Sequence, residues 1–261
     1  MTYIEVDGLS KRFGDTVALD DVSFAVPDGE FVIVLGVSGS GKSTLLRALS
    51  GLLSPTDGEI AIAGESMVGP RPEVAMIFQQ HNIIGDMTAY SNSLSGGVHR
   101  SGFFSSVLQL QDDAEKHRAL DALDTVGLLD EAEQKARSMS GGQQQRIGIA
   151  RALVQQPNVL LADEPVASLD PGSAQSVMGY LRTASEDRGL TTFCSLHQVN
   201  IARKFGHRFI GLRDGEKVFD GYRDDLTIEV IDDIYGDIDT EGMFVRDDGD
   251  ADAPTDEVAT S

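Results

Sequence analysis

A continuous apolar run that leads into a glycine-rich turn constrains this chain more than any other feature. Residues 31–35 read FVIVL, and residues 36–43 read GVSGSGKS, which fits the pattern G-x-x-x-x-G-K-[ST] in full. A helical pattern, LLRALSGL, follows. A buried strand, a phosphate-binding turn and a helix in this order are typical of a P-loop, so a chance match of a Gly/Ser-rich turn is disfavoured.

Each residue type in this turn has a physical role in binding a nucleotide. Glycines let backbone N–H groups wrap phosphate oxygens closely, and the following helix N-terminus favours negative charge. Lys42 would reach the β- and γ-phosphates, and the hydroxyl of Ser43 would bind Mg²⁺. The predicted ATP-binding set from this stretch is Gly36, Val37, Ser38, Gly39, Ser40, Gly41, Lys42, Ser43 and Thr44.

A second apolar run supplies two carboxylates. Residues 158–165 read NVLLADEP. Asp163 would stand at the carboxyl end of a parallel strand beside the P-loop, where it could hold Mg²⁺. Glu164 follows at once, and a carboxylate beside a metal-binding Asp suits a general base that orients the attacking water. An acidic pair at a strand end is common, and the upstream P-loop gives this one its meaning.

The remaining patterns predict alternating strands and helices. YIEV and TVALDDVSFAV read as strands separated by turns at Gly8 and Gly14, and GEIAIAG, VAMIF, TTFCSL and HRFIGL read as further strands. Residues from about 85 to 157 lack strand-like runs, and their second half has helical periodicity. We therefore expect a parallel α/β core with a helical insertion, followed by a disordered acidic tail from about residue 246.

Charge excludes some classes of partner. The net charge is −21, from 42 acidic and 21 basic residues, and only six of the basic residues are Lys. This acidity argues against nucleic acid and against direct binding to anionic lipid. Scarce Lys with acid excess is similar to proteins of salt-accumulating microbes, because the screening length shrinks to about 3 Å at 1 M salt. An ordinary acidic protein with an acidic tail is the alternative.

No stretch predicts export or membrane insertion. The longest apolar runs are far shorter than the roughly 20 residues that span a bilayer, and MTYIEVDG lacks the features of a signal peptide. The single Cys194 cannot form an internal disulfide and is expected to be a small buried hydrophobe.

Taken together, the motifs resemble the nucleotide-binding subunit of an ATP-binding cassette (ABC) transporter over nearly all of residues 1–225. The motifs occur in the order of that family: KRFG with Phe13, the P-loop, MIFQQ with Gln79, SGGQQQR at 140–146, LLADE at 160–164, SLD at 168–170 and CSLHQV with His197. The ordered set is far more specific than any one motif.

The resemblance implies a fold and a set of roles. It implies a P-loop NTPase domain of the ABC ATPase type over residues 1–245, with a mixed sheet core, an antiparallel β subdomain and the helical subdomain at about 85–157, followed by the tail at 246–261. Catalytic roles would fall to Glu164, His197 and Gln79; Mg²⁺ would bind Ser43, Gln79 and Asp163; and Phe13 would stack on adenine. Alone, Phe13 could also be a core aromatic at a strand end, and a lone Gln79 or His197 would more often be structural.

Two Ser-Gly-Gly stretches compete for the family's signature, which would hold the ATP of a second subunit. LSGGV at 94–98 has the family's usual first letter, but Val98 replaces the Gln, and Gly102 interrupts any immediate helix. MSGGQ at 139–143 keeps the Gln and precedes an apolar-faced helix. We therefore predict a loop at 94–97, and a signature that acts in trans at Ser140, Gly141, Gly142 and Gln143, with Asp170 as an acid that faces the dimer interface.

The process that ATP hydrolysis would drive follows only from the resemblance. It implies a homodimer of cassettes, two transmembrane permease subunits that dock near 80–92, an extracellular substrate-binding protein and a peripheral place on the cytoplasmic side of the cell membrane. SLHQV, ADEPVASLDPGSA and IFQQHNII look most like phosphonate importers. Importers of phosphate, another oxyanion or an amino acid are the alternatives.

Non-transport ABC ATPases form a competing class. Those of DNA repair and chromosome organisation carry long coiled coils between P-loop and signature, whereas the gap here is about 100 residues without sustained heptads. Translation types carry two cassettes per chain, and this chain carries one. A nucleotide-binding protein without turnover would need neither Glu164 nor His197.

Overall fold

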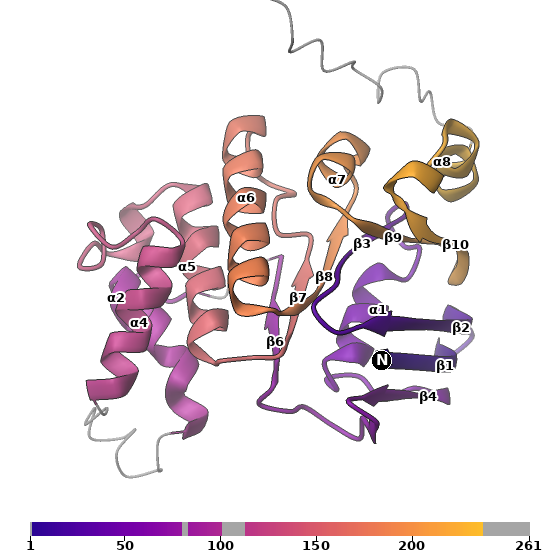
Figure 1. Cartoon of the computed structure of the whole chain (residues 1–261), viewed down its shortest axis with the longest axis horizontal. Coiled ribbons are helices and arrows are strands. Elements are labelled where there is room, and N and C mark those ends of the chain that lie inside the picture. The colour runs from indigo at the N-terminus through magenta and orange to yellow at the C-terminus, as the bar shows by residue number, and fades with distance from the viewer. Residues whose placement is uncertain (1, 80–82, 101–112, 237–261) are drawn as a thin grey trace, which may run out of the picture.

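Two sheets and a set of helices make up the computed structural model, which describes residues 2–79, 83–100 and 113–236 (Figure 1). Within these residues the larger sheet has the strand order β10-β9-β3-β8-β7-β6, and the smaller has β2-β1-β4-β5. The strands are β1 (Thr2–Phe13), β2 (Thr16–Pro27), β3 (Phe31–Leu35), β4 (Asp57–Ile62), β5 (Glu65–Ser66), β6 (Val74–Ile77), β7 (Val159–Asp163), β8 (Thr191–Leu196), β9 (Arg208–Arg213) and β10 (Glu216–Tyr222).

The larger sheet is parallel except at one edge. Strands β6, β7, β8, β3 and β9 pair in parallel, and only β10 pairs antiparallel, as a hairpin with β9. The smaller sheet is antiparallel throughout. The mixed core with an antiparallel sheet confirms the predicted fold class. Because the carboxyl ends of parallel strands share one edge, residues that follow β3, β6, β7 and β8 are brought together.

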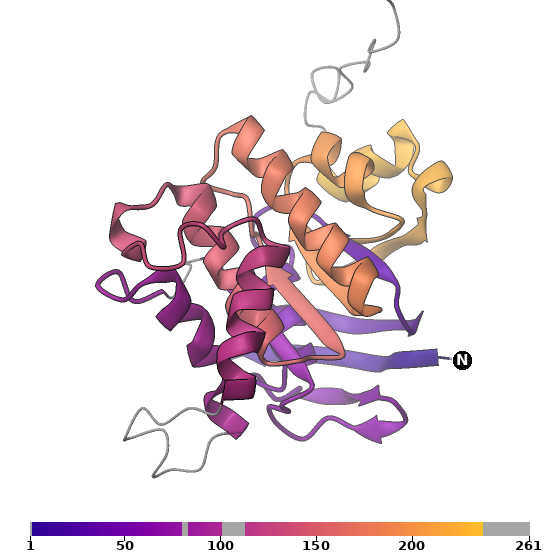
Figure 2. The same cartoon turned by 60° about the vertical axis from the view of Figure 1, so that its left-hand side comes forward.

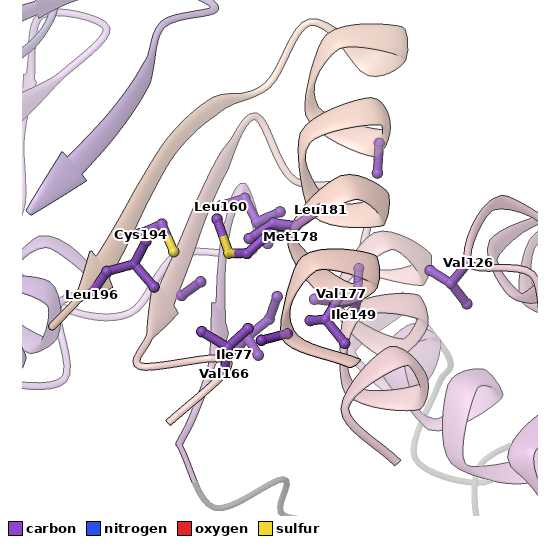
Figure 3. Packing of buried hydrophobic residues seen from close by; sticks show 14 of the residues in the cluster. Ile77, Val126, Ile149, Leu160, Val166, Val177, Met178, Leu181, Cys194 and Leu196 are labelled. Atoms are coloured by element: carbon purple, nitrogen blue, oxygen red, sulfur yellow. The ribbon is translucent and has the colours of Figure 1, made fainter. Parts of the chain in front are cut away.

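The continuous apolar strands are buried on both faces. In β3, the side chains of Phe31, Ile33 and Leu35 belong to one hydrophobic cluster, and those of Val32 and Val34 belong to the other. This period of two follows from strand geometry. Figure 3 shows the first cluster, where β7 and β8 pack against the helices. The second joins the opposite face to α1 and to the smaller sheet.

Helices cover the larger sheet and extend beyond its β6 edge, which is labelled in Figure 1 and turned toward the viewer in Figure 2. A group of them, α2, α4 and α5, packs together beside that edge. None of the helices in the described ranges has the length and apolar character needed to cross a membrane. The helices are α1 (Lys42–Leu49), α2 (Ala89–Leu94), η1 (Ser95–Arg100), α4 (Asp113–Thr125), η2 (Ala136–Ser138), α5 (Gly141–Val154), α6 (Pro171–Arg188), α7 (Val199–Phe205), η3 (Arg223–Asp225) and α8 (Ile228–Tyr235).

One predicted turn is wrong. Gly14 lies in the turn between β1 and β2 as expected, but Gly8 lies inside β1. The pairing of β1 with β2 shifts register between Val6 and Leu9, and Gly8 has a φ of 58° there. Its N–H donates to Ser23 Oγ at 2.8 Å. A glycine can mark a β-bulge as well as a turn, and the two share the same local signal. The predicted tail at 246–261 lies outside the described residues.

Candidate active site

The predicted P-loop lies between the end of β3 and the start of α1. Residues 36–41 form the turn, and α1 begins at Lys42. Gly41 has a left-handed φ of 105°, and an added Cβ would lie 2.6 Å from the carbonyl oxygen of Ala18 in β2. Only glycine fits such a position. This close approach holds the turn against the β1–β2 hairpin, which carries Phe13.

The first turn of α1 is left open for a ligand. Within the described residues, α5 and α6 are capped by the side chains of Ser140 and Asp170, whereas no side chain caps α1. The first N–H groups of a helix have no intrahelical partner. The hydroxyl of Ser40 is also buried without a hydrogen-bond partner in the described part of the chain. A phosphate group would pair with such donors and gain from the helix dipole.

Lys42 is buried inside the turn that it belongs to. Its Nζ donates to the carbonyl oxygens of Gly36 at 2.7 Å and Val37 at 2.8 Å. Burial lowers the pKa of Lys42, and the carboxylates of Glu164 and Asp163 raise it in part. Two effects thus oppose each other at this amine: burial disfavours its protonated form, and the two nearby carboxylates favour it.

A chain of hydroxyls joins the P-loop helix to the acidic pair. Ser43 Oγ donates to Asp163 Oδ1 at 2.9 Å, and Ser195 Oγ donates to the same oxygen at 3.0 Å. The backbone N–H of Glu164 donates in turn to Ser195 Oγ at 2.8 Å. Ser195 was not among the residues predicted from the sequence. Its signal is a hydroxyl in the otherwise apolar end of a buried strand, and such a hydroxyl must find partners.

Glu164 and His197 meet at the carboxyl end of the sheet. Strands β7 and β8 are parallel neighbours, with Asp163 opposite Ser195, so the residues just beyond them lie close together. The Nε2 of His197 contacts Oε1 of Glu164. Glu164 has a left-handed φ of 48°, which is strained for a residue with a side chain. The fold holds this residue at that backbone angle where its carboxylate reaches the imidazole.

The contacts of His197 show that its Nε2 carries a proton. Its Nδ1 lies 3.4 Å from Nζ of Lys42 and 3.2 Å from the carbonyl oxygen of Gly36. A neutral imidazole has one donor and one acceptor, and an ammonium can only donate. A carboxylate oxygen can only accept, so Nε2–H donates to Glu164, whereas Nδ1 faces both the ammonium of Lys42 and the carbonyl oxygen of Gly36. Lysine, imidazole and carboxylate form one connected line beside the P-loop.

Phe13 and Gln79 lie outside this hydrogen-bonded cluster. Gln79 is exposed and stands two residues beyond β6, at the same sheet edge as Asp163. Phe13 ends β1 with half of its surface exposed, and Nζ of Lys11 lies 5.2 Å from its ring centroid. In the described part of the chain, no hydrogen bond connects either side chain to Lys42, Asp163 or Glu164. Their roles toward adenine, water and Mg²⁺ stay predictions.

The stretch at 139–143 forms a capped helix start. Ser140 Oγ accepts from the N–H of Gln143 at 3.2 Å, and Gln143 Oε1 accepts from the N–H of Ser140 at 2.9 Å. This capping box leaves Gly141 and Gly142 as the first two residues of α5, whose N–H groups lack intrahelical acceptors. The start of α5 is thus a second place where backbone N–H groups and a helix dipole could meet a phosphate.

Asp170 lies next to this helix start. It caps α6 by accepting from the N–H of Ser173 at 3.0 Å, and hydrogen bonds from Ser173 lower its pKa. An added Cβ on Gly142 would lie 3.2 Å from Cβ of Ser173. The two elements that were predicted to face a second subunit therefore pack side by side. Among the described residues, no hydrogen bond or ion pair joins them to the chain's own P-loop.

The prediction of a loop at 94–97 is wrong. Leu94 ends α2, and Ser95–Arg100 form the 3₁₀ helix η1. An added Cβ on Gly96 would lie 2.1 Å from the carbonyl oxygen of Arg151 in α5. The glycine allows close contact between η1 and α5, so its role is in packing. Glycine that serves helix contact looks the same in sequence as glycine that serves a phosphate turn.

Comparison with known proteins gives this geometry a context. Residues 19–167 match the family model described as "ABC transporter". The chain is 63% identical to "Phosphonates import ATP-binding protein PhnC" of Halobacterium salinarum, over 98% of this chain and 91% of that protein. It is 45% identical to the "Phosphonates import ATP-binding protein PhnC 2" of Cupriavidus metallidurans, over 89% of this chain and 86% of that protein.

Solved structures agree on the fold. One is the dimer of the ATP-binding cassette MJ0796 in a post-hydrolysis state bound to ADP and Pi. It is 32% identical with a TM-score of 0.72, over 84% of this chain and 98% of that chain. The ADP conformation of MJ1267, a cassette of an ABC transporter, has a TM-score of 0.78 at 24% identity, over 89% of this chain and 94% of that chain. The latter likeness shows the fold alone.

Proposed function

The chain belongs to the ABC transporter family, and from that membership we propose that it is the ATP-hydrolysing subunit of a phosphonate importer. The observation that carries the substrate class is the 63% identity, over nearly the whole chain, to a protein named for phosphonate import. Relatives named for phosphonate import come from Halobacterium salinarum and Haloquadratum walsbyi. These sources agree with the acidic, Lys-poor composition of this chain, which is similar to that of proteins from salt-accumulating microbes.

Hydrolysis would use the line of side chains at the carboxyl end of the sheet. A water oxygen attacks the γ-phosphorus of ATP, the bond from that phosphorus to the bridging oxygen of ADP breaks, and Glu164 accepts the proton of the water. His197 donates to Glu164 and so fixes the direction of its carboxylate. Lys42 and the N–H groups at the start of α1 offset the charge on the phosphate oxygens.

The residues present fit Mg²⁺. Asp163 and Ser43 place a carboxylate and a hydroxyl 2.9 Å apart beside the P-loop. Mg²⁺ is usually held by one or two carboxylates together with substrate phosphates and waters, so this small donor set is sufficient. We assign Ser43, Asp163 and the amide of Gln79 to the ion. When bound, Mg²⁺ would shield the charge of the β- and γ-phosphates.

A complete site needs a second copy of the chain. The surface formed by residues 140–143 and Asp170 carries open N–H groups, yet among the described residues no hydrogen bond or ion pair joins it to the chain's own P-loop. In a head-to-tail homodimer, the start of α5 would face the γ-phosphate held by the partner's P-loop. The dimeric form of a related cassette bound to ADP and Pi supports a dimer.

The segment at 83–92 is the proposed contact for the permease subunits. Its apolar side chains Ile84 and Met87 are exposed. Asn92 is buried and binds both backbone groups of Ile84. Its Oδ1 accepts from the N–H of Ile84 at 2.8 Å, and its Nδ2 donates to the carbonyl oxygen of Ile84 at 3.0 Å. A shaped loop with exposed apolar side chains fits a cytoplasmic helix of a membrane partner. Residues 80–82 of this predicted contact lie outside the described residues.

The substrate is tested by growth. We expect deletion of the gene to abolish growth on 2-aminoethylphosphonate as the only phosphorus source, while growth on inorganic phosphate continues. Wild-type protein should restore growth on the phosphonate, and Glu164→Gln should not. Loss of growth on phosphate with intact growth on the phosphonate would identify a phosphate importer instead.

A further inference from the structure

Helix α8 connects the described C-terminal end of the chain to the core beside the site. Its N-terminus is capped by Thr227, and the side chains of Ile231 and Ile234 are fully buried. The side chain of Ile234 lies directly over Gly211 in β9, where an added Cβ would be 2.6 Å from it. Arg213 also donates to the carbonyl oxygen of Asp233 at 3.0 Å. These contacts fix α8 against the strand next to β3, which leads into the P-loop.

The last residue of α8 reaches the site itself. Tyr235 is only 7% exposed, and its hydroxyl donates to the carbonyl oxygen of His197 at 3.2 Å. His197 is the first residue beyond β8, so its carbonyl is not part of a strand ladder. Burial raises the pKa of Tyr235, and a backbone hydrogen bond from Gly36 lowers it in part. The hydroxyl therefore stays protonated and remains a donor at neutral pH.

The hydroxyl has a specific role beyond the packing of the Tyr235 ring. A Phe ring would fill the same space, but it could not hold the backbone of His197. The same histidine contacts Glu164 through Nε2 and lies beside Lys42 and Gly36 through Nδ1. A small rotation of its backbone would move the imidazole away from the carboxylate. One hydrogen bond from α8 thus acts on the element that orients the catalytic base.

We propose that Tyr235 is a positioning residue for ATP hydrolysis, because its hydroxyl holds the backbone of His197 and so keeps the imidazole aligned on Glu164. This inference rests on the proposed ATPase function. Tyr235 belongs to none of the motifs that identify the family in this sequence. It makes the described C-terminal helix a part of the catalytic arrangement.

The first test compares Tyr235→Phe with Tyr3→Phe, a matched variant that removes a hydrogen-bonded hydroxyl from β1. In molar KCl, Tyr235→Phe should lower kcat by about three- to tenfold, which corresponds to the free energy of one hydrogen bond. The KM for ATP should change by less than about twofold. Tyr3→Phe should keep the wild-type kcat. In a His197→Ala background, Tyr235→Phe should cause no further loss, because the two residues act in series.

Equal kcat in the Tyr235→Phe and Tyr3→Phe variants would overturn the proposal, and so would a loss of the same size in the His197→Ala background. A second readout does not depend on activity. In ¹⁵N-histidine NMR spectra of the nucleotide-free protein, Tyr235→Phe should shift the His197 signals and leave those of the other four histidines in place. Unchanged His197 signals would also overturn it. An inactive wild-type protein would contradict the proposed function, and the spectra would still show whether Tyr235 holds His197 in place.

Discussion

The imidazole Nε2 of His197 contacts the carboxylate Oε1 of Glu164, although the two residues are 33 positions apart in the chain. Each stands one residue beyond the end of its strand, and the two strands are parallel neighbours. The contact therefore depends on strand order and register, and it places a carboxylate and an imidazole beside the P-loop lysine.

Replacing Glu164 by Gln should abolish turnover and retain ATP binding. The amide keeps the size of the side chain but cannot accept the proton of the attacking water, so kcat should fall by at least about 100-fold. ATP should then accumulate on a dimer, which size-exclusion chromatography with and without ATP would detect. Turnover at the wild-type rate would disprove the role of Glu164 as the base.

Ser195→Ala should lower both stability and kcat. It leaves the N–H of Glu164 without its acceptor and removes one donor from Asp163, which should cost about 1–3 kcal/mol of the free energy of unfolding. Ser185→Ala is the control, because Ser185 Oγ in α6 is a buried hydroxyl 2.8 Å from Oγ1 of Thr192, which lies on β8 together with Ser195. Denaturant unfolding and ATPase assays should show lost stability in both variants and lost kcat only in Ser195→Ala. The same kcat in both would remove Ser195 from the site.

Two inactive variants should regain activity when they are mixed. Lys42→Ala removes the P-loop lysine, and Gly142→Asp places a carboxylate beside the open N–H groups of α5, where it would repel phosphate. A mixed head-to-tail dimer contains one site with both elements intact, so partial ATPase activity should return after subunit exchange. Each variant alone supplies the control. A mixture that remains inactive despite confirmed exchange would argue that the signature does not act in trans.

Charged side chains in the segment at 83–92 should uncouple transport from ATP hydrolysis. Ile84→Glu combined with Met87→Glu changes exposed side chains, so the free energy of unfolding and the basal ATPase rate should stay near the wild type. Uptake of the phosphonate by cells should be lost, because charges would meet an apolar partner surface. Val218→Glu, on the exposed face of β10, is the control that should keep uptake. Normal uptake in the double variant would place the permease contact elsewhere.

Gly96→Ala should destabilise the protein without impairing its chemistry. The new methyl group would overlap the carbonyl oxygen of Arg151, so η1 and α5 must separate, at about 1–3 kcal/mol. Chemical denaturation should show this loss, while kcat per folded molecule should match the wild type. A severe loss of kcat at unchanged stability would mean that the stretch at 94–98 acts on ATP after all.

Local patterns in the sequence predicted much of the fold and of the site. The P-loop is contiguous, so its residues, the strand before it and the helix after it can be recognised together. The buried strands β3, β7 and β8 are also readable, because burial on both faces demands a continuous apolar run. By contrast, β10 was not predicted, since its side chains are only exposed or half-buried. The bulge at Gly8 and the helix contact at Gly96 were misread, because glycine serves turns, bulges and close packing alike.

The sequence by itself determined the family, the P-loop and the identity of the acidic pair, since these depend on residues that are neighbours in the chain. Only the tertiary structure decided how the side chains that we propose as catalytic are held. Ser195 joins Asp163 to Glu164, and Tyr235 holds His197, through hydrogen bonds between residues more than 30 positions apart. Periodicity and turn propensity act over a few residues, whereas such bonds exist only once strand order and register bring distant segments together.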